Sequence, residues 1–589
     1  MTNTDIAGVF EKLADILEYK GENPFRIRAY RGAVRTIGGL VESLASIRND
    51  PQRSLKNLDG IGADLASKIE TLLDTGRLPL LDELTAEVPA VVWEMLRVPG
   101  LGPRKVKLLV ETLAIDSLDT LELACQAGRV ATLKGFGEKT QQSILDNLPF
   151  ARNPTHSRLL WLEADGILQE LLAWIRSCPE ARRVEGAGSW RRGCETVGDL
   201  DVVVESQRPA AVMEHLLAWQ GTTAVLLQGD TKTSVRGPRN MQIDLRVVAE
   251  DSFGAAWQYF TGSQEHNVRL RTRARELGLS INEYGVYRIE PAAEAVPKSA
   301  RGPSLGGQTE EEVYRAVGLP WIPPELREGR DELVLAGQGR IPPLVKLDDI
   351  RGDLHMHTIA TDGENTLVEM VRAAIERGLE YIAITDHSQR VSMARGLDAS
   401  RLLRQWDDID ALNQSLCADG PAPIVVLKGI EVDMLEKGGL DLPDAVLRQA
   451  DWVVASLHYG QQQPRDRITA RILEAIANPW VRVIGHPTGR LINRRPPYDV
   501  DIEAVISAAA GNGTCLEINA NPSRLDLNEH HASAAGKAGV RMVISTDAHD
   551  TSGLDLLRCG VLQARRAGLA AADIANTLPL AELLACKRG

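Results

Sequence analysis

The sequence predicts a multidomain protein in which helical domains precede an α+β part and a final α/β part. Three observations support this fold class. The first quarter of the chain repeats a short glycine motif between helical patterns, and the middle has two strand-like segments that carry aspartates. From Arg351 onward, apolar strands alternate with helical stretches, which is typical of a parallel sheet. At 589 residues and roughly 150 residues per domain, about four domains are expected.

The composition limits the class of protein. The chain has no run of about 18 or more apolar residues and no signal-peptide pattern, so we expect a cytoplasmic protein with no membrane partner. Its seven cysteines show no paired spacing, which argues against a disulfide framework and against a zinc ribbon. Because the net charge is −13, any contact with DNA must be local.

The glycine motif has the form apolar-x-Gly-apolar-Gly and occurs at Leu58–Gly62, Val98–Gly102 and Leu133–Gly137. This is a helix-hairpin-helix signature. Glycines allow a tight turn, and the N–H groups that open the next helix can bind a DNA phosphate. One such motif is most often only a connection, but three copies followed by Lys or Arg favour phosphate binding. The expected DNA-binding glycines are Gly60, Gly62, Gly100, Gly102, Gly135 and Gly137.

Two strand-like segments in the middle of the chain carry three aspartates. Asp199 and Asp201 share one face of the segment 197–204, because side chains two apart on a strand point the same way. Asp244 lies on the polar face of the segment 241–248. Three carboxylates at one edge could hold two Mg²⁺ or Mn²⁺ ions for phosphoryl transfer.

A turn upstream of these strands is suited to phosphate. Gly188 and Ser189 offer backbone N–H groups and a hydroxyl, and Arg191 and Arg192 add positive charge. An isolated Asp-x-Asp is more often an exposed strand end than a metal site. The turn, the arginines and the third aspartate together favour a nucleotidyl-transfer site.

This set of residues resembles the palm of family X DNA polymerases. The resemblance implies catalytic, metal-holding roles for Asp199, Asp201 and Asp244, and contact of Lys232 with the DNA template strand. It also implies a nucleotide site in which the Tyr259–Gly262 turn packs under the deoxyribose, although paired aromatics are often only core. The implied nucleotide-binding residues are Gly188, Ser189, Arg192, Gly198, Tyr259, Phe260, Gly262, Asn267 and Arg271.

The same resemblance places a lyase-like domain at the N-terminus. Lys68 falls where DNA polymerase beta has its Schiff-base lysine, which would make it catalytic for removal of a 5′-deoxyribose-phosphate. Asp64 replaces another lysine of that pocket. The alternative is that Lys68 only contacts the 5′-phosphate.

The last part of the chain places metal-ligand types where apolar strands end. The carboxyl ends of parallel strands meet at one mouth, so these side chains should converge. Imidazole with carboxylate suits Zn²⁺ or Mn²⁺, and nine ligands are enough for two or three ions. The expected ligands are His355, His357, Asp362, His387, Glu431, His458, His486, Asp547 and His549.

These ligands resemble the full set of the PHP (polymerase and histidinol phosphatase) domain, which bacterial family X polymerases carry at this end. The resemblance implies a distorted (β/α) barrel with 3′–5′ exonuclease or other 3′-end-processing activity, including cleavage at abasic sites. A density of Pro and Gly favours an extended linker before it. The expected divisions are a lyase-like helix-hairpin-helix domain 1–84, a fingers-like helix-hairpin-helix domain 85–152, palm 153–249, thumb 250–318, linker 319–350 and PHP domain 351–589.

The function predicted from the sequence is a gap-filling repair polymerase with its own 3′-end nuclease. Its partners would be gapped or primer-template DNA and dNTPs, and one chain is expected to act as a monomer. One alternative is a histidinol-phosphatase-like enzyme with a degenerate polymerase part. Another is a DNA-binding scaffold, which the complete ligand sets disfavour.

Overall fold

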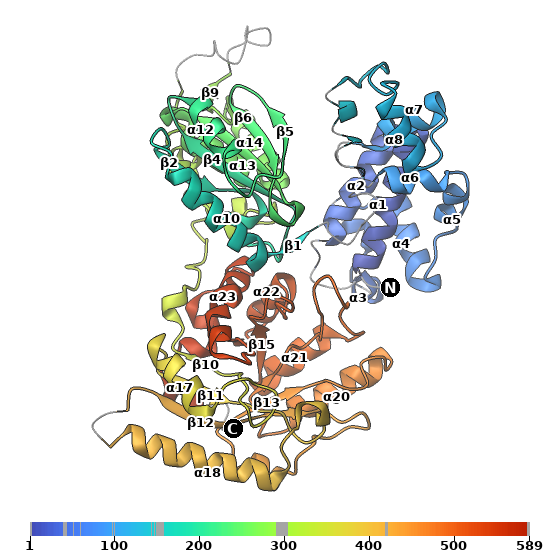
Figure 1. Cartoon of the computed structure of the whole chain (residues 1–589). Helices are drawn as coiled ribbons and strands as arrows, with labels where there is room; N and C mark the ends of the chain where they lie inside the picture. The colour runs from blue at the N-terminus through green and yellow to red at the C-terminus, as the bar shows by residue number, and fades with distance from the viewer. Residues whose placement is uncertain are drawn as a thin grey trace. The chain divides into compact units, whose positions relative to one another are not determined.

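The computed structural model describes residues 3–585 apart from 39, 41–43, 51, 59, 97, 99–100, 139, 143, 146–147, 149–157, 290–303 and 419–421. It divides into two compact units. One contains residues 1–158, 222–228 and 233–240, and the other contains the remainder (Figure 1). Within the described part, no helix combines the length and apolarity needed to cross a bilayer.

The first 150 or so residues are helical, as the sequence predicts. Two apolar clusters form their core, one around Phe10 and Tyr30 and the other around Met95 and Leu109. The helices are α1 (Asn3–Lys20), α2 (Pro24–Gly38), α3 (Leu44–Asn49), α4 (Ala63–Thr75), α5 (Pro79–Ala86), α6 (Ala90–Met95), α7 (Pro103–Leu113) and α8 (Leu118–Gln126).

The glycine motifs lie where helices begin. Gly60 has φ 72°, a conformation that favours glycine, and Gly62 is the residue at which α4 is capped. Gly102 caps α7 in the same way, and Gly135 has φ 89° before the next turn. Gly100 lies outside the described residues. The two capping glycines therefore occupy the helix-start positions that the motif predicts.

The palm is a five-stranded sheet of order β2-β4-β7-β6-β5. Gly198 separates β3 from β4, and the alternation predicted for β4 holds, because Leu200 and Val202 are fully buried. Helices α10 (Trp161–Arg176) and α12 (Pro209–Leu217) belong to this part. The strands are β2 (Arg183–Gly186), β4 (Asp199–Glu205), β5 (Ala224–Gln228), β6 (Lys232–Arg236) and β7 (Gln242–Val248), with the short pair β1 (Leu159–Leu160) and β3 (Thr196–Val197).

The thumb follows as two helices, a hairpin and a short helix. These are α13 (Phe253–Thr261), α14 (Gln264–Glu276), β8 (Leu279–Asn282) with β9 (Gly285–Arg288), and α15 (Glu310–Ala316). Their core includes Leu270, Val313 and Tyr314.

The expectation of an extended linker at 319–350 is wrong for much of this segment. It contains the 3₁₀ turn η7 (Pro324–Leu326) and helix α16 (Glu332–Gly337). Arg327 is completely buried there and makes a bidentate ion pair with Glu310, with N–O distances of 2.6 and 3.0 Å. Pro323 and Pro324 begin η7 without preventing burial, and the ion pair of Arg327 fixes the chain that follows.

The C-terminal part is a parallel barrel of seven strands in sequential order, with helices outside (Figure 1). An isolated parallel bridge between Met356 and Ala548 brings the last strand to the first, so the predicted distorted barrel is confirmed. The strands are β10 (Gly352–Asp353), β11 (Tyr381–Ile384), β12 (Val425–Asp433), β13 (Trp452–Ser456), β14 (Val483–Ile484), β15 (Cys515–Asn519) and β16 (Met542–Ser545). The main helices are α17 (Leu367–Glu376), α18 (Ala399–Leu416), α20 (Arg465–Ala477), α21 (Ile502–Asn512), α22 (Glu529–Lys537) and α23 (Leu557–Arg566).

Arg327→Ala should destabilise the thumb strongly, because it leaves the buried Glu310 with less compensation. Removing one partner of a buried ion pair costs about 3–5 kcal/mol of the free energy of unfolding. Arg208→Ala is the control, since Arg208 makes an exposed ion pair with Glu180 and should change stability by about 1 kcal/mol or less. Urea denaturation of both variants measures the difference, and equal midpoints would contradict the expected role of Arg327.

Candidate active sites

The three palm aspartates lie on neighbouring parallel strands. Asp201 on β4 is directly opposite Asp244 on β7, and Asp199 is opposite Gln242. Gly188 lies against the same spot, because a Cβ atom there would be 2.4 Å from Asp201 Oδ2. Its φ of 65° also favours glycine. The phosphate turn and the carboxylates predicted from sequence are therefore adjacent.

The three aspartates repel one another. Burial, together with the charges of Asp199 and Asp244, raises the pKa of Asp201 to about 7. Lys232 donates to Asp244 Oδ2 at 2.7 Å, and Gln242 donates to Oδ1 at 3.1 Å. Lys232, which the resemblance assigns to the template, is thus an ion-pair partner of Asp244 here.

The two arginines of the phosphate turn differ in their contacts. Arg191 makes a bidentate ion pair with Glu310 and stacks over Trp257. It therefore holds the palm to the thumb. Arg192 donates to Thr261 O at 2.6 Å and to Glu328 at 3.1 Å. Ser189 Oγ is buried and has no hydrogen-bond partner among the described residues, which leaves its hydroxyl available to a phosphate oxygen.

The predicted sugar-side residues lie at the end of α13. Tyr259 and Phe260 make an edge-on ring contact with centroids 5.1 Å apart, and Gly262 follows the helix with φ 71°. Asn267 is mostly buried, and its amide donates to Tyr259 O at 2.8 Å. Arg271 donates to Asn267 O. The Asn267 side chain is therefore directed at the backbone of Tyr259 in this structure and supports the turn there.

Lys68 lies on α4 beside the Tyr30 ring, at 5.9 Å from its centroid. It forms an ion pair with Asp64, one helical turn earlier. A Schiff-base role would require this pair to open, because the nucleophile is the neutral amine.

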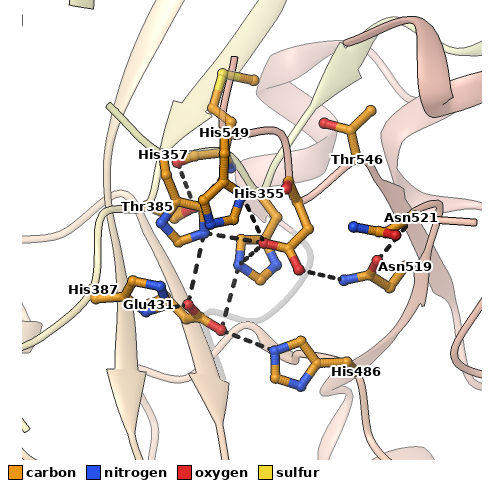
Figure 2. Close-up of polar contacts among 12 residues, drawn as sticks. His355, His357, Thr385, His387, Glu431, His486, Asn519, Asn521, Thr546 and His549 are labelled. Carbon is orange, nitrogen blue, oxygen red and sulfur yellow. Dashed lines mark hydrogen bonds and ion pairs between the residues drawn. The ribbon is translucent and has the colours of Figure 1, made fainter. Parts of the chain in front are cut away.

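The barrel brings together all nine ligands predicted from sequence. Figure 2 labels six of them: His355, His357, His387, Glu431, His486 and His549. Three overlapping groups each place their ligand atoms within 4.8 Å of one another. His486 joins them through Glu431, with 3.1 Å between Nε2 and Oε1. Glu431 lies within β12 rather than after its end. The groups are His357, Asp362, His387 and His549; His355, His357 and Asp547; and His387, Glu431 and His458.

A second layer of polar side chains orients these ligands, and the sequence analysis missed it. Glu517 on β15 accepts from His355 Nδ1 at 2.7 Å and from the His486 N–H at 2.6 Å. Asn519, two residues on, donates to Asp547 at 3.1 Å. Glu517 and Asn519 alternate at the end of a strand, which is the same signal that identified the other ligands.

The second layer fixes which histidine nitrogen is free. Because His355 Nδ1 is bonded to Glu517, its Nε2 faces the cluster, where it makes no hydrogen bond. The buried His357 Nδ1 likewise has no hydrogen-bond partner in the described part of the chain. Buried imidazole nitrogens facing carboxylates fit metal ions, so the residues present suit a multi-metal centre.

The pKa values of the histidines depend on the carboxylates that surround them. Burial lowers the pKa of His387, but Glu431 and Asp362 offset this and raise it to about 10. The pKa of His549 rises to about 9 through Asp362 and Asp547, also against burial. Burial and the neighbouring His387 lower the pKa of His357 to about 4. Protons on His387 and His549 therefore balance part of the carboxylate charge.

One side of the centre is open. The side chains of His549 and Asp362 are 39% and 34% exposed, whereas His355 and His357 are fully buried. A phosphate ester would therefore approach from the side of His549 and Asp362.

Binding of Mn²⁺ or Zn²⁺ to the metal-free protein at pH 8 should release protons. His387 and His549, with raised pKa values, hold protons at this pH and must lose them to become ligands. The apparent affinity should therefore strengthen as the pH rises toward about 9–10. Calorimetry in two buffers of different ionisation enthalpy measures the release, and His549→Ala should release fewer protons. Identical heats of binding in both buffers would exclude proton release by the unaltered protein.

Comparison with family models matches four parts of the chain. Residues 1–78 match a helix-hairpin-helix domain and residues 94–148 a SAM-like helix-hairpin-helix tandem. Residues 256–328 match the DNA polymerase beta thumb. Residues 353–521 match the PHP domain. Each match falls on the part of the chain where the corresponding motif lies.

Curated relatives cover either the whole chain or the barrel alone. The DNA polymerase/3′–5′ exonuclease PolX of Bacillus subtilis (strain 168) is 37% identical over 586 residues, which is 99% of both chains. A probable phosphatase of Thermoanaerobacter sp. (strain X514) is 36% identical over 208 residues, 33% of this chain and 78% of that protein. A probable phosphatase of Acetivibrio thermocellus is 31% identical over 206 residues, 33% of this chain and 78% of its own length. Because the full-length match spans every part described above, the chain belongs to the PolX family of DNA polymerases with 3′–5′ exonuclease activity.

Proposed function

We propose that this polymerase fills short gaps during DNA repair and that its barrel trims or unblocks 3′ ends, including ends at abasic sites. The observation that carries the proposal is the presence of two complete acidic sites on one chain. One set lies at the palm sheet edge beside a phosphate turn, and the other at the barrel mouth. Helix-hairpin-helix motifs, which bind the DNA backbone without reading its sequence, suit an enzyme that acts at gaps.

In the palm, Asp199, Asp201 and Asp244 would hold Mg²⁺ or Mn²⁺. Such ions supply charge neutralisation and alignment of the triphosphate. Ser189 would donate its free hydroxyl to a phosphate oxygen, and Arg192 would add a positive charge beside it. Lys232 would leave Asp244 and contact the template backbone. The Tyr259–Gly262 turn would flank the sugar.

In the barrel, the nine ligands would hold two or three Zn²⁺ or Mn²⁺ ions. When bound, the ions supply a reactive water and stabilise charge on the leaving oxygen. Glu517 keeps His355 in the tautomer that offers Nε2. Asn519 fixes the outer oxygen of Asp547. The exposed side at His549 and Asp362 admits a 3′-terminal phosphodiester.

Incubation of the full chain with a gapped duplex, dNTPs and Mn²⁺ tests the proposal. A gap-filling enzyme with a 3′-end nuclease extends the primer to the end of the gap and also removes a 3′-blocking group. A small-molecule phosphatase with a degenerate polymerase part would do neither on DNA, and a scaffold would leave all substrates unchanged.

Asp199→Ala and Asp201→Ala should each lower the rate of nucleotide addition by on the order of 10³-fold, because a carboxylate that holds the ions is lost. Cleavage of 3′ ends should stay near that of the unaltered protein, since its ligands come from another sheet. Asp251→Ala, at an exposed turn, is the control. Primer extension and 3′-end release are measured on the same preparations, and undiminished extension by the Asp199→Ala/Asp201→Ala double variant would remove the palm assignment.

His355→Ala and Asp547→Ala should lose bound metal and 3′-end cleavage while they keep gap filling. Each change deletes a ligand and leaves buried carboxylates without a partner. Metal content by mass spectrometry and both activities are compared with those of Asp555→Ala, an exposed partner of Arg377 outside the mouth. Cleavage that survives in both variants would show that the barrel is not the nuclease.

A further inference from the structure

Helix α23 of the barrel carries one face that packs on the palm. Arg558, Leu562 and Arg566 are spaced four apart, so they lie in one row on the helix. Arg558 pairs with Asp165 at 2.9 Å. Leu562 fills the space beside Gly193, where an added Cβ would be 2.5 Å from its Cγ. Both elements belong to the same compact unit.

Arg566 ends this row beside the phosphate turn. Its Nη1 donates to the backbone carbonyl of Arg192 at 2.8 Å and to Glu328 Oε1 at 2.8 Å. Its Nη2 donates to Glu529 at 2.9 Å. The side chain is only 5% exposed, so these bonds are made in a site where water screens little.

Glu328 is shared between two arginines. The oxygen that accepts from Arg566 also accepts from Arg192 Nε at 3.1 Å. Arg330 pairs with Glu529 at 3.3 Å, so three arginines face two glutamates in this cluster. Burial lowers the pKa of the neighbouring His530, which therefore adds no charge at neutral pH.

This charge count depends on the barrel. With Arg566 present, the cluster keeps one positive charge in excess. Without it, Arg192 and Arg330 would be matched by Glu328 and Glu529, and Glu328 would be free to neutralise Arg192 alone. The carbonyl of Arg192 would also lose the donor that holds the turn.

We infer that Arg566 is a positioning residue for the polymerase reaction. It shares the charge of Glu328 with Arg192, so that Arg192 is not fully neutralised and can pair with the triphosphate of an incoming dNTP. It also fixes the turn that carries Ser189. The inference rests on the proposed role of Arg192 at the triphosphate. The barrel is therefore part of the nucleotide site of the palm as well as the site of the nuclease.

Steady-state gap filling by the full-length Arg566→Gln variant tests this. The KM for dNTP should rise about tenfold with little change in kcat, as expected for the loss of one charge-assisted hydrogen bond. The exonuclease rate should stay within about twofold, since Arg566 is not a metal ligand. Arg565→Gln is the matched control, because Arg565 lies on the same helix and pairs with Glu325 instead. Its KM should not change.

Two further variants separate charge from structure. Arg566→Gln combined with Glu328→Gln should restore the KM to within about threefold, because the competing carboxylate is gone. A purely structural role of Arg566 would give no rescue in the double variant. The inference would be overturned by that lack of rescue, by an unchanged KM in Arg566→Gln, or by an equal rise of the KM in Arg565→Gln. Arg192→Gln tests the proposed function separately. If Arg192→Gln leaves the KM for dNTP unchanged, Arg192 does not bind the triphosphate, and the proposed role of Arg192 fails together with the inference about Arg566. If the KM rises in Arg192→Gln but not in Arg566→Gln, only the inference about Arg566 fails.

Discussion

The barrel depends on compensation of buried negative charge. Seven carboxylates with at most 8% of their side-chain or residue surface exposed lie around its mouth, and isolated ionised carboxylates are costly to bury. Hydroxyl and amide donors stabilise the outer ones, as Thr546 does for Asp353 and Thr488 for Asp526. The inner ones face imidazole rings, and they raise the pKa of His387 and that of His549 above neutral pH, although burial opposes this. They are Asp353, Asp386, Glu431, Asp433, Glu517, Asp526 and Asp547.

The same constraint shapes the palm and thumb, with arginine in place of histidine. Glu310 is buried between Arg191 and Arg327, and the two guanidinium groups hold its pKa well below the usual range despite burial. This pair ties the phosphate turn to the thumb. Because a guanidinium stays charged at any ordinary pH, this part of the structure has a fixed charge balance, whereas the balance in the barrel changes with protons and metal.

The sequence predicted those features that depend on short-range pattern. The alternation around Asp199 and Asp201 placed both on one face of β4, and the residues that end barrel strands converge as expected. Glu517 was missed although it obeys the same rule, because its strand reads Cys-Leu-Glu-Ile-Asn and contains no histidine to draw attention. The segment 319–350 was misjudged because Pro and Gly density reports local propensity. Burial of Arg327 depends on Glu310, which lies outside that segment.

The contact between α23 and the palm could not be predicted from either partner alone. An arginine-rich helix such as Leu557–Arg566 normally presents its cations to solvent, and its apolar side is satisfied by the barrel. The hydrogen-bond acceptors of its two arginines, Asp165 for Arg558 and the Arg192 carbonyl for Arg566, are more than 370 residues away in the chain. Gly193 is a local sign of the contact, since a Cβ there would collide with Leu562. The polymerase turn and the barrel helix therefore constrain each other's sequence, and a change of either surface has to be accommodated by the other.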